Sequence, residues 1–334
     1  MARYSIILPV RNGGEYVKEC VNSILNQTIT DFRLQVLDNC STDGTREWIK
    51  SLNDNRISIH PADRSLSIEE NWARITSIPK NEFITLIGHD DILFPEYLQS
   101  MDDLIAKHPN ATLYQAHFTY INSKGQDIRH CKPMDEVQSA EEFVAFFLAN
   151  MIDTMGTGFM MRAKDYDACG GISGSYPNLL FADFELFISL TRLGYKATTF
   201  NHTFSFRLHE SMTTTSSDLK FHDAFAKFVE YLYSLKHNAE FDRIIKRYAL
   251  DFLSLYCKGL SHRLLRTPMS KRKGKTVEYF INLTKAYADK LVPGNHFDPE
   301  NQFSVSVARQ IDSNVLTRSL FLFFKRIIRK PVLS

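Results

Sequence analysis

The sequence predicts an α/β fold with a mostly parallel central sheet, followed by a region of long helices. Within the first 120 residues, apolar runs alternate with stretches of helical spacing, which is the βαβ pattern of a parallel sheet. Farther along, five apolar residues recur at steps of four and three, as on one face of a helix: Phe221, Phe225, Phe228, Leu232 and Leu235. We therefore expect a boundary near Ser216, with an α/β domain at 1–216 and a helical region at 217–334.

Five short apolar runs, rich in β-branched and aromatic residues, predict the strands of this sheet. They are Tyr4–Val10, Arg33–Leu37, Arg56–Ile59, Phe83–Ile87 and Thr112–His117. Helical spacing predicts helices at Glu15–Leu25, Thr45–Leu52 and Ala140–Ala149. The polar stretch between Asn122 and Val137 is expected to be irregular.

Composition narrows the class of protein without naming a partner. Hydrophobic residues make up 44% of the chain and charged residues 23%, as in folded soluble proteins, and the formal net charge of +2 argues against a chain built mainly to bind nucleic acid. The five cysteines include no CxxC pair, which favours a reducing compartment. The N-terminus is typical of a first strand rather than a signal peptide, and no apolar run approaches the roughly 18 residues of a membrane span. These features predict a cytoplasmic protein.

The segment "LIGHDD" places His89, Asp90 and Asp91 directly after a buried strand. Ligands of open α/β sheets bind at the carboxyl ends of the strands. One aspartate could simply cap the following helix, but that would leave the second unexplained. Because adjacent carboxylates raise each other's pKa unless a cation offsets their charge, the pair predicts a divalent metal held together with a phosphate.

A second strand ends in the segment "LQVLDNCSTDGT", which puts Asp38 at another strand tip. A carboxylate there could accept hydrogen bonds from the N–H or hydroxyl groups of a nucleoside. The first strand ends at Pro9 and leads through Arg11 and Asn12 into a helix, with neither GxGxxG nor GxxxxGK[ST]. Nicotinamide and P-loop nucleotide sites are therefore disfavoured.

Together these three segments resemble the inverting glycosyltransferases of family 2, which have the GT-A fold, over roughly residues 3 to 212. "SIILPVRNGGEYVKECVNSILNQT" is similar to that family's first strand and helix, "VLDNCSTDGT" to its "VVDDGSTDGT", and "LIGHDD" to its "LDADD". The resemblance implies a nucleoside diphosphate sugar donor and a divalent ion, Mn²⁺ or Mg²⁺, on Asp90. It implies donor contacts at Pro9, Arg11, Asn12, Asp38, Asn39, His89 and Asp90. The chain departs from the pattern at Asn39, where a second aspartate is usual, and at Gly88, where the first carboxylate of the metal motif is usual.

Two later segments extend the resemblance. "NLLFADFELFISLTRLGYKA" is similar to the family's "EDxxLxxRLxxxG" helix, which implies that Asp183 is the general base, with Ala182 in place of the usual glutamate and Glu185 as the rival base. "FSFRLHESMTT" is similar to "YRxHxxSxS", which implies Arg207 as a diphosphate contact and His209 as a metal ligand. The alternative for these two residues is a salt bridge at a strand end and a buried histidine.

Residues 316–330, "LTRSLFLFFKRIIRK", combine apolar and basic side chains. The segment is too short to cross a bilayer, but it is suited to lying on an anionic one. The alternative is a terminal helix that packs on the protein and leaves a basic edge in solvent.

The resemblance implies an inverting, metal-dependent transferase of a hexosyl or deoxyhexosyl group. The donor-binding half would be about 1–120 and the acceptor-binding half 121–216. The expected acceptor is a saccharide, polyprenyl-linked, in bacterial surface polysaccharide synthesis of the O-antigen or capsule type, at the inner face of the plasma membrane. Two alternatives stay open. A sugar nucleotidyltransferase should have a glycine-rich basic loop, of which Arg11–Glu15 is a poor version, and an inactive saccharide-binding relative would fit Gly88 and Ala182.

Overall fold

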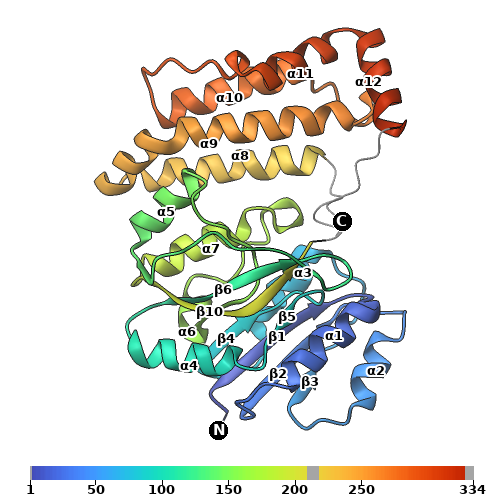
Figure 1. Cartoon of the computed structure of the whole chain (residues 1–334), viewed down its shortest axis with the longest axis vertical. Helices are drawn as coiled ribbons and strands as arrows, with labels where there is room; N and C mark the ends of the chain where they lie inside the picture. Colours follow the sequence, from blue (N-terminus) through green and yellow to red (C-terminus); the bar gives the residue numbers. More distant parts are fainter. Residues whose placement is uncertain (1, 209–217, 328–334) are drawn as a thin grey trace. The chain divides into compact units, whose positions relative to one another are not determined.

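The computed structural model describes residues 2–208 and 218–327 (Figure 1). The chain divides into two compact units. The first consists of Met1–Phe143 and Ile152–His209, and the second of Val144–Met151 and Glu210–Ser334.

The first unit is built on one large sheet. Its strands are β1 (Tyr4–Val10), β2 (Phe32–Asp38), β3 (Ile57–Ile59), β4 (Phe83–Leu86), β5 (Ile92–Leu93), β6 (Leu113–Ile121), β7 (Asp127–His130), β8 (Val137–Gln138), β9 (Phe159–Arg162) and β10 (Lys196–Arg207). They lie in the order β3-β2-β1-β4-β9-β6-β10-β5, with β7 beside β6 and β8 beside β10. Because β9 is antiparallel to both β4 and β6, the strands β3, β2, β1, β4, β6 and β10 all run in one direction. The predicted mostly parallel sheet is confirmed.

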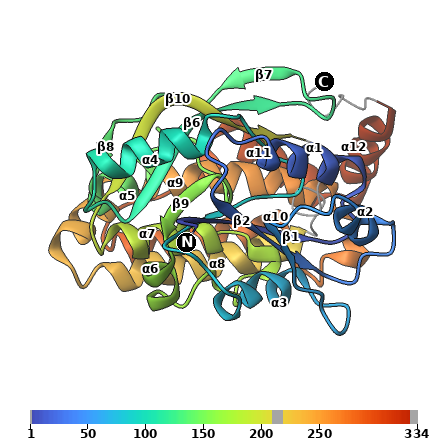
Figure 2. The same cartoon turned by 90° about the horizontal axis from the view of Figure 1, so that it is seen from below.

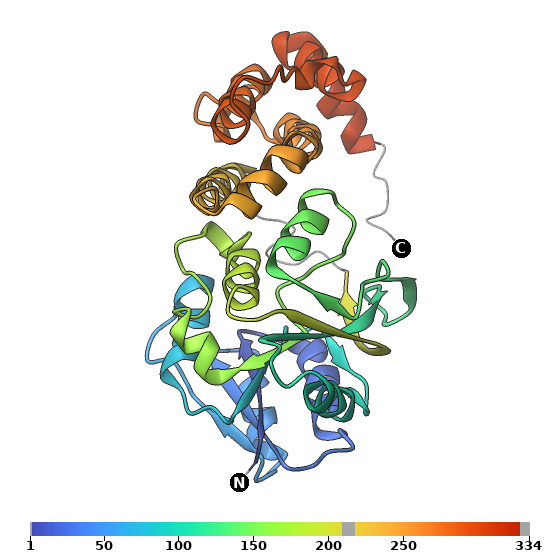
Figure 3. The ribbon, with the colours of Figure 1, turned by 90° about the vertical axis from the view of Figure 1, so that its left-hand side faces the viewer.

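Helices cover both faces of this sheet. They are α1 (Gly14–Leu25), α2 (Thr45–Ser51), α3 (Ile68–Ala73), α4 (Tyr97–Lys107), α6 (Ala163–Ala168) and α7 (Ala182–Thr191). Figures 2 and 3 show α1 and α4 on one face, with α6 and α7 on the other. The inner face of α1 buries Val17, Cys20, Val21 and Ile24, at the spacing of an amphipathic helix.

Pairing across the sheet determines the elements that sequence periodicity did not reveal. The stretch from Asn122 to Val137, expected to be irregular, contains β7 and begins β8, so that prediction was wrong. β7 is short and mostly exposed, so it lacks the apolar alternation that marks a strand. It forms because Gly125, with φ 78°, closes a turn that returns the chain beside β6. The strand at the start of the sequence was predicted with its observed limits.

The second unit is helical in the part of the chain that the structure describes. Its helices are α8 (Asp218–Leu235), α9 (Ala239–Arg266), α10 (Val277–Leu291), α11 (Phe303–Ser313) and α12 (Val315–Ile327), while α5 (Ala140–Leu148) joins the two units in sequence. The predicted apolar face of α8 is buried at Phe225, Phe228, Leu232 and Leu235. Within residues 2–208 and 218–327, every helix is too short or too polar to span a bilayer.

A buried ion cluster around Asp312 ties α10, α11 and α12 together. The Asp312 carboxylate accepts hydrogen bonds from Arg272 Nη1 at 2.6 Å, from the Val277 backbone N–H at 2.8 Å and from Arg318 Nε at 3.0 Å. Burial alone would raise the pKa of Asp312, but these donors lower it overall. Arg318 is therefore committed to the fold of this unit.

His222 on α8 provides a test of stability in the second unit. It is 3% exposed and packs against the Phe280 ring. Burial, followed by the charge of Lys275, lowers its pKa to about 4. A folded pKa below the unfolded value means that stability is complete above the unfolded pKa near 6.5 and is lost as the pH falls towards the folded pKa.

We expect the free energy of unfolding to fall by about 2 kcal/mol between pH 7 and pH 5 through this residue. His222→Phe keeps an aromatic ring and cannot take up the proton, so it should remove that part of the pH dependence. Urea titrations at the two pH values measure the difference. An equal loss of stability in the variant would contradict the assignment.

Candidate functional site

The carboxyl ends of β1, β2 and β4 lie at one edge of the sheet, because these three strands are parallel neighbours. Val10 lies opposite Asp38 in the register of β1 and β2. The segment with His89 and Asp90 follows β4 at the same edge. The sequence-predicted residues of the first 120 positions are therefore brought together at the edge where α/β sheets bind ligands.

Asp38 ends β2 with one carboxylate oxygen available. Its side chain is almost completely buried, and Oδ1 accepts a hydrogen bond from the Ser41 backbone N–H at 3.3 Å. Oδ2 is buried and has no partner among the described residues. Since a buried acceptor without a donor is costly, this atom is suited to an N–H or O–H group of a ligand.

Asn39 uses both atoms of its side-chain amide on the protein. Nδ2 donates to the Leu66 carbonyl at 2.9 Å, and Oδ1 accepts from the Leu66 backbone N–H at 2.8 Å. The neighbouring Ala62 N–H donates to the Asp38 carbonyl at 2.8 Å. The asparagine therefore holds the segment of residues 62–66 beside Asp38. An aspartate here could not donate to Leu66.

Asn12 similarly joins two loops of the site. Its backbone N–H donates to Ser41 Oγ at 3.0 Å, and its Oδ1 accepts from the Thr42 N–H at 2.8 Å. The residue has φ 52°, a left-handed conformation that asparagine tolerates well. Pro9 is buried in β1, and Arg11 is exposed on the loop between them. The structure places all three residues at the predicted edge.

Asp90 and Asp91 have different environments. Asp91 is 1% exposed and accepts hydrogen bonds from Thr157 Oγ1 at 2.6 Å and from the Arg207 backbone N–H at 3.0 Å. Burial, together with the charge of Asp90, raises the pKa of Asp91 well above its usual value. Asp91 therefore joins β4 to the Thr157 segment and to β10, whereas His89 and Asp90 are partly exposed at the strand tip.

The close approach of these carboxylates explains Gly88. A Cβ atom at position 88 would lie 2.7 Å from Asp90 Oδ1 and 2.9 Å from Asp91 Oδ2. Both contacts are with the ends of side chains, so a larger residue at position 88 requires the two carboxylates to shift. Gly88 therefore lets Asp90 and Asp91 lie close to the strand tip in the conformation described.

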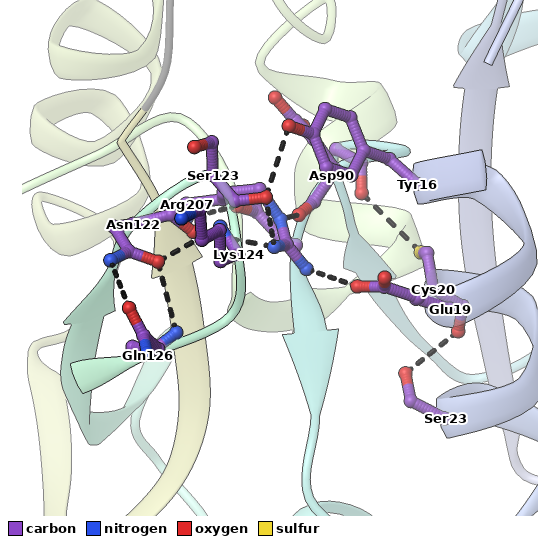
Figure 4. Close-up of polar contacts among 12 residues, drawn as sticks. Tyr16, Glu19, Cys20, Ser23, Asp90, Asn122, Ser123, Lys124, Gln126 and Arg207 are labelled. Atoms are coloured by element: carbon purple, nitrogen blue, oxygen red, sulfur yellow. Dashed lines mark hydrogen bonds and ion pairs between the residues drawn. The ribbon is translucent and has the colours of Figure 1, made fainter. Parts of the chain in front are cut away.

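Arg207, predicted to contact the diphosphate, is 3% exposed and lies among protein groups (Figure 4). Its Nε donates to the Asp90 carbonyl at 2.7 Å, and its Nη2 forms an ion pair with Glu19 Oε2 at 2.5 Å. Nη1 lies 3.3 Å and 3.4 Å from the carbonyl oxygens of Asn122 and Ser123. The structure therefore shows Arg207 as the centre of a protein cluster.

Asp183 lies in the first turn of α7, where its carboxylate is partly buried. Burial dominates its environment and raises the pKa to about 6, although backbone N–H groups of the first turn lower it in part. A Cβ atom on Gly156 would lie 3.5 Å from Asp183 Oδ2, and the next residue, Thr157, is bonded to Asp91. The Gly156–Thr157 segment thus connects Asp183 with the Asp90 loop.

The segment that leads into α7 has a strained backbone. Asn178, Leu179 and Phe181 have φ values of 55°, 56° and 69°. Asparagine tolerates this conformation, but it costs free energy for Leu179 and Phe181, and strained residues of this kind cluster at active sites and ligand-binding segments. The Asn178 N–H is fixed by Glu69 Oε1 of α3 at 2.7 Å.

The rival base Glu185 accepts a hydrogen bond from the Tyr176 hydroxyl at 2.5 Å. This bond commits one carboxylate oxygen to a neighbouring segment. The geometry therefore favours Asp183 over Glu185 as the proton acceptor, and the assignment stays a prediction.

The donor set is sparse for a metal ion held by protein alone. Across residues 2–208 and 218–327, no three side chains of His, Cys, Asp or Glu converge as a metal site. Asp90 offers hard oxygen ligands that suit Mg²⁺ or Mn²⁺, provided that a bound diphosphate supplies others. His209, predicted as a second ligand, lies outside the described residues.

Sequence reasoning missed Glu19, Gly156, Thr157 and Tyr176. Nothing in the sequence distinguishes Glu19 from other glutamates on exposed helix faces, and its partner Arg207 lies 188 positions away. Gly156 and Thr157 occur in the segment "MGTGF", which carries no periodicity or motif that would single them out. Such pairings follow from tertiary structure.

Comparisons with solved structures identify the architecture. The chain resembles the crystal structure of S. aureus TarS 1–349 in complex with UDP-GlcNAc, with a TM-score of 0.66 and 15% identity, over 97% of this chain and 92% of that chain. At this level of identity the likeness shows the fold alone, which is of the GT-A type.

Sequence comparisons agree. A Rickettsia conorii glycosyltransferase is 26% identical over 193 residues, which is 57% of this chain and 31% of the relative. Glycosyltransferase GlyG of Streptococcus pneumoniae is 27% identical, over 36% of this chain and 41% of its own. Chondroitin synthase of Pasteurella multocida is 32% identical over 57% of this chain and 19% of its own. The matched regions thus span between about a fifth and two fifths of the length of these relatives. The profile described as Glycosyl transferase family 2 matches residues 5–170, and the chain belongs to this family.

Proposed function

We propose that the protein is an inverting glycosyltransferase that moves one hexosyl or deoxyhexosyl group from a nucleoside diphosphate sugar to a saccharide acceptor. Family membership supports the reaction class. The observation that carries the inverting mechanism is Asp183, a carboxylate with a pKa raised to about 6 that is connected through Gly156 and Thr157 to the Asp90 loop. The donor would occupy residues 1–120 and the acceptor residues 121–216.

Each carboxylate has a separate role in this proposal. Asp38 Oδ2 accepts a hydrogen bond from the nucleoside. Arg11, on the exposed loop after β1, and His89, at the strand tip, face the donor's phosphates. A divalent ion, Mn²⁺ or Mg²⁺, held by Asp90 and the donor's diphosphate would neutralise the charge that develops on the leaving group.

Asp183 takes the proton of the acceptor hydroxyl as that oxygen attacks the anomeric carbon. The new C–O bond forms on the face of the sugar opposite the diphosphate. The bond between the anomeric carbon and the diphosphate oxygen breaks, and the nucleoside diphosphate leaves. The configuration at the anomeric carbon is thereby inverted. A base with a pKa near 6 is ionised at neutral pH and remains basic enough to assist the attack.

A donor panel tests the reaction class. The protein is incubated with UDP-, GDP- and dTDP-sugars, Mn²⁺ or Mg²⁺ and oligosaccharide acceptors, and the release of nucleoside diphosphate is measured. Release that depends on the acceptor supports transfer. Pyrophosphate production from a nucleoside triphosphate and a sugar phosphate would indicate a nucleotidyltransferase. Saccharide binding without turnover would indicate the inactive relative.

For the acceptor we propose a polyprenyl-linked saccharide of bacterial surface polysaccharide synthesis, used at the cytoplasmic face of the plasma membrane. Names of relatives support polysaccharide synthesis, since one of them is chondroitin synthase. The second support is the apolar surface of α12, defined by five exposed residues: Val315, Leu316, Leu320, Phe323 and Phe324.

Charge determines what this apolar surface would contact. From Ser313 to the end of the sequence there is no Asp or Glu, whereas Lys325, Arg326, Arg329 and Lys330 follow the apolar run. Five apolar side chains of α12 stay exposed although Arg318 attaches this 13-residue helix to Asp312 of α11. Apolar anchors with basic flanks are suited to an anionic lipid surface.

The double substitution Leu320→Gln and Phe324→Gln should weaken binding to anionic phospholipid vesicles by about tenfold or more, because two exposed apolar side chains that would enter the lipid are lost. Vesicle co-sedimentation measures the change, with Phe303→Gln as the matched control, since Phe303 is 84% exposed but lies on α11. Transfer to a short soluble acceptor should be unchanged. Equal vesicle binding by the double variant would contradict the membrane role.

A further inference from the structure

Arg207 of β10 contacts three other segments at the carboxyl edge of the sheet (Figure 4). Its backbone N–H binds Asp91 and its Nε binds the Asp90 carbonyl, which fixes the loop after β4. Its Nη1 faces the carbonyl groups of Asn122 and Ser123 in the β6–β7 turn. Nη2 reaches Glu19 on α1. One side chain from β10 therefore joins α1, the Asp90 loop and the β6–β7 turn.

Three further contacts support the same cluster. The Arg207 guanidinium lies over the Tyr16 ring, 4.6 Å from its centre, and the Tyr16 hydroxyl donates to the Ser123 carbonyl at 3.2 Å. Cys20, one turn farther along α1, directs Sγ to the Gly88 carbonyl at 3.4 Å. The face of α1 that carries Tyr16, Glu19 and Cys20 is thus attached to the strand tip on both sides of Asp90.

The two partners of the Arg207–Glu19 ion pair differ greatly in their exposure to solvent. The Arg207 side chain is 1% exposed and the Glu19 side chain 51%. A guanidinium that deep in the protein needs both counter-charge and acceptors, and Glu19 is the carboxylate that pairs with it. With Nε, Nη1 and Nη2 all directed to protein oxygens, Arg207 has little hydrogen-bonding capacity left for a phosphate.

We propose that Glu19 and Arg207 are a positioning pair that holds the backbone of Asp90 in place for the donor. This inference rests on the proposed function, in which Asp90 faces the diphosphate. It assigns a role to Glu19, and it replaces the predicted phosphate contact of Arg207 by an indirect one. The pair acts through the Asp90 carbonyl and through Asp91, and touches neither the sugar nor the acceptor.

The two roles for Arg207 predict opposite effects of removing Glu19. If Arg207 bound the diphosphate, Glu19→Ala would unmask its positive charge and strengthen the binding of the anion. If the pair positions Asp90, Glu19→Ala should weaken nucleoside diphosphate binding about tenfold, as is usual when a supporting partner of a binding residue is lost. The matched control is Glu15→Ala, one turn earlier on α1, where Glu15 pairs with Lys18.

The first measurement is calorimetric titration of UDP and GDP into each protein with Mn²⁺ and with EDTA. We expect KM for the donor to rise in Glu19→Ala while kcat changes less, and Glu19→Gln, which keeps an acceptor oxygen, to recover part of the loss. Tighter nucleotide binding in Glu19→Ala would overturn the proposal, as would behaviour equal to that of Glu15→Ala.

The second measurement needs no ligand and so separates this inference from the proposed function. Amide hydrogen exchange should accelerate in residues 87–94 and 122–126 of Glu19→Ala, and stay at the wild-type rate in Glu15→Ala. Faster exchange without any nucleotide binding would mean that the proposed function fails and the positioning pair stands. Unchanged exchange in both segments would overturn the pair itself.

Discussion

Asp183→Asn should lower kcat by about 10²- to 10⁴-fold, the usual worth of general-base catalysis. The amide keeps the size of the carboxylate and can still accept backbone hydrogen bonds, but it cannot take the proton of the acceptor hydroxyl. The affinity for the donor should barely change, because Asp183 faces the acceptor in the proposed geometry. Steady-state kinetics with saturating donor, together with nucleotide titrations, separate these two effects.

The pH profile provides a second signature of the same residue. The pKa of Asp183 is raised to about 6, so the carboxylate is protonated below that pH and cannot act as a base. In the wild type, kcat should therefore fall as the pH drops through about 6. The residual kcat of Asp183→Asn should not show this pH dependence. Glu185→Gln is the matched control on the same helix. Near-normal turnover by Asp183→Asn, with a large loss in Glu185→Gln, would assign the base to Glu185.

Asp90→Asn should abolish measurable transfer and also weaken metal-dependent nucleotide binding, by about ten- to a hundredfold. The reason is that Asp90 is the partly exposed carboxylate at the strand tip, and an amide is a poor ligand for Mg²⁺ or Mn²⁺. Titration of nucleoside diphosphate with Mn²⁺ and with EDTA measures the effect, and the wild type should show the larger difference between the two conditions.

Asp91→Asn should have the opposite pattern of effects, because the Asp91 carboxylate stabilises the fold. It accepts hydrogen bonds from both Thr157 and Arg207, and an amide nitrogen would face one of these donors. Asp91→Asn should therefore lower the melting temperature, whereas Asp90→Asn should leave it close to that of the wild type. Undiminished nucleotide affinity of Asp90→Asn in Mn²⁺ would contradict the role of Asp90.

Much of the donor edge could be predicted from sequence because its residues follow strand ends directly. Asp38 and Asp90 come immediately after apolar runs, and parallel strands bring such ends together. Asp183 required the family resemblance, since periodicity alone indicates only a carboxylate at the start of a helix. The roles of these three residues remain predictions.

Residues whose partners are distant in sequence were harder to interpret. Arg207 matched a motif for a diphosphate contact, yet its guanidinium pairs with Glu19 across 188 positions. Asn39 stands where the motif has an aspartate, and its side-chain amide binds the Leu66 backbone. Gly88 was a missing ligand in the sequence, and in the structure it leaves room for the carboxylates of Asp90 and Asp91. For Arg207 and Asn39 the deciding contact is tertiary, whereas for Gly88 it is the local conformation of the loop after β4.

The measurement that tests the central claim most directly is the configuration of the first sugar released from the donor. Water replaces the acceptor when a nucleoside diphosphate sugar is incubated with the protein alone, so no acceptor needs to be known. Proton NMR, recorded from the start of the reaction, resolves the two anomers before they equilibrate. An inverting enzyme with Asp183 as base should release the β-anomer first from an α-linked donor, and Asp183→Asn should slow that release. First release of the α-anomer would contradict the mechanism proposed for this chain.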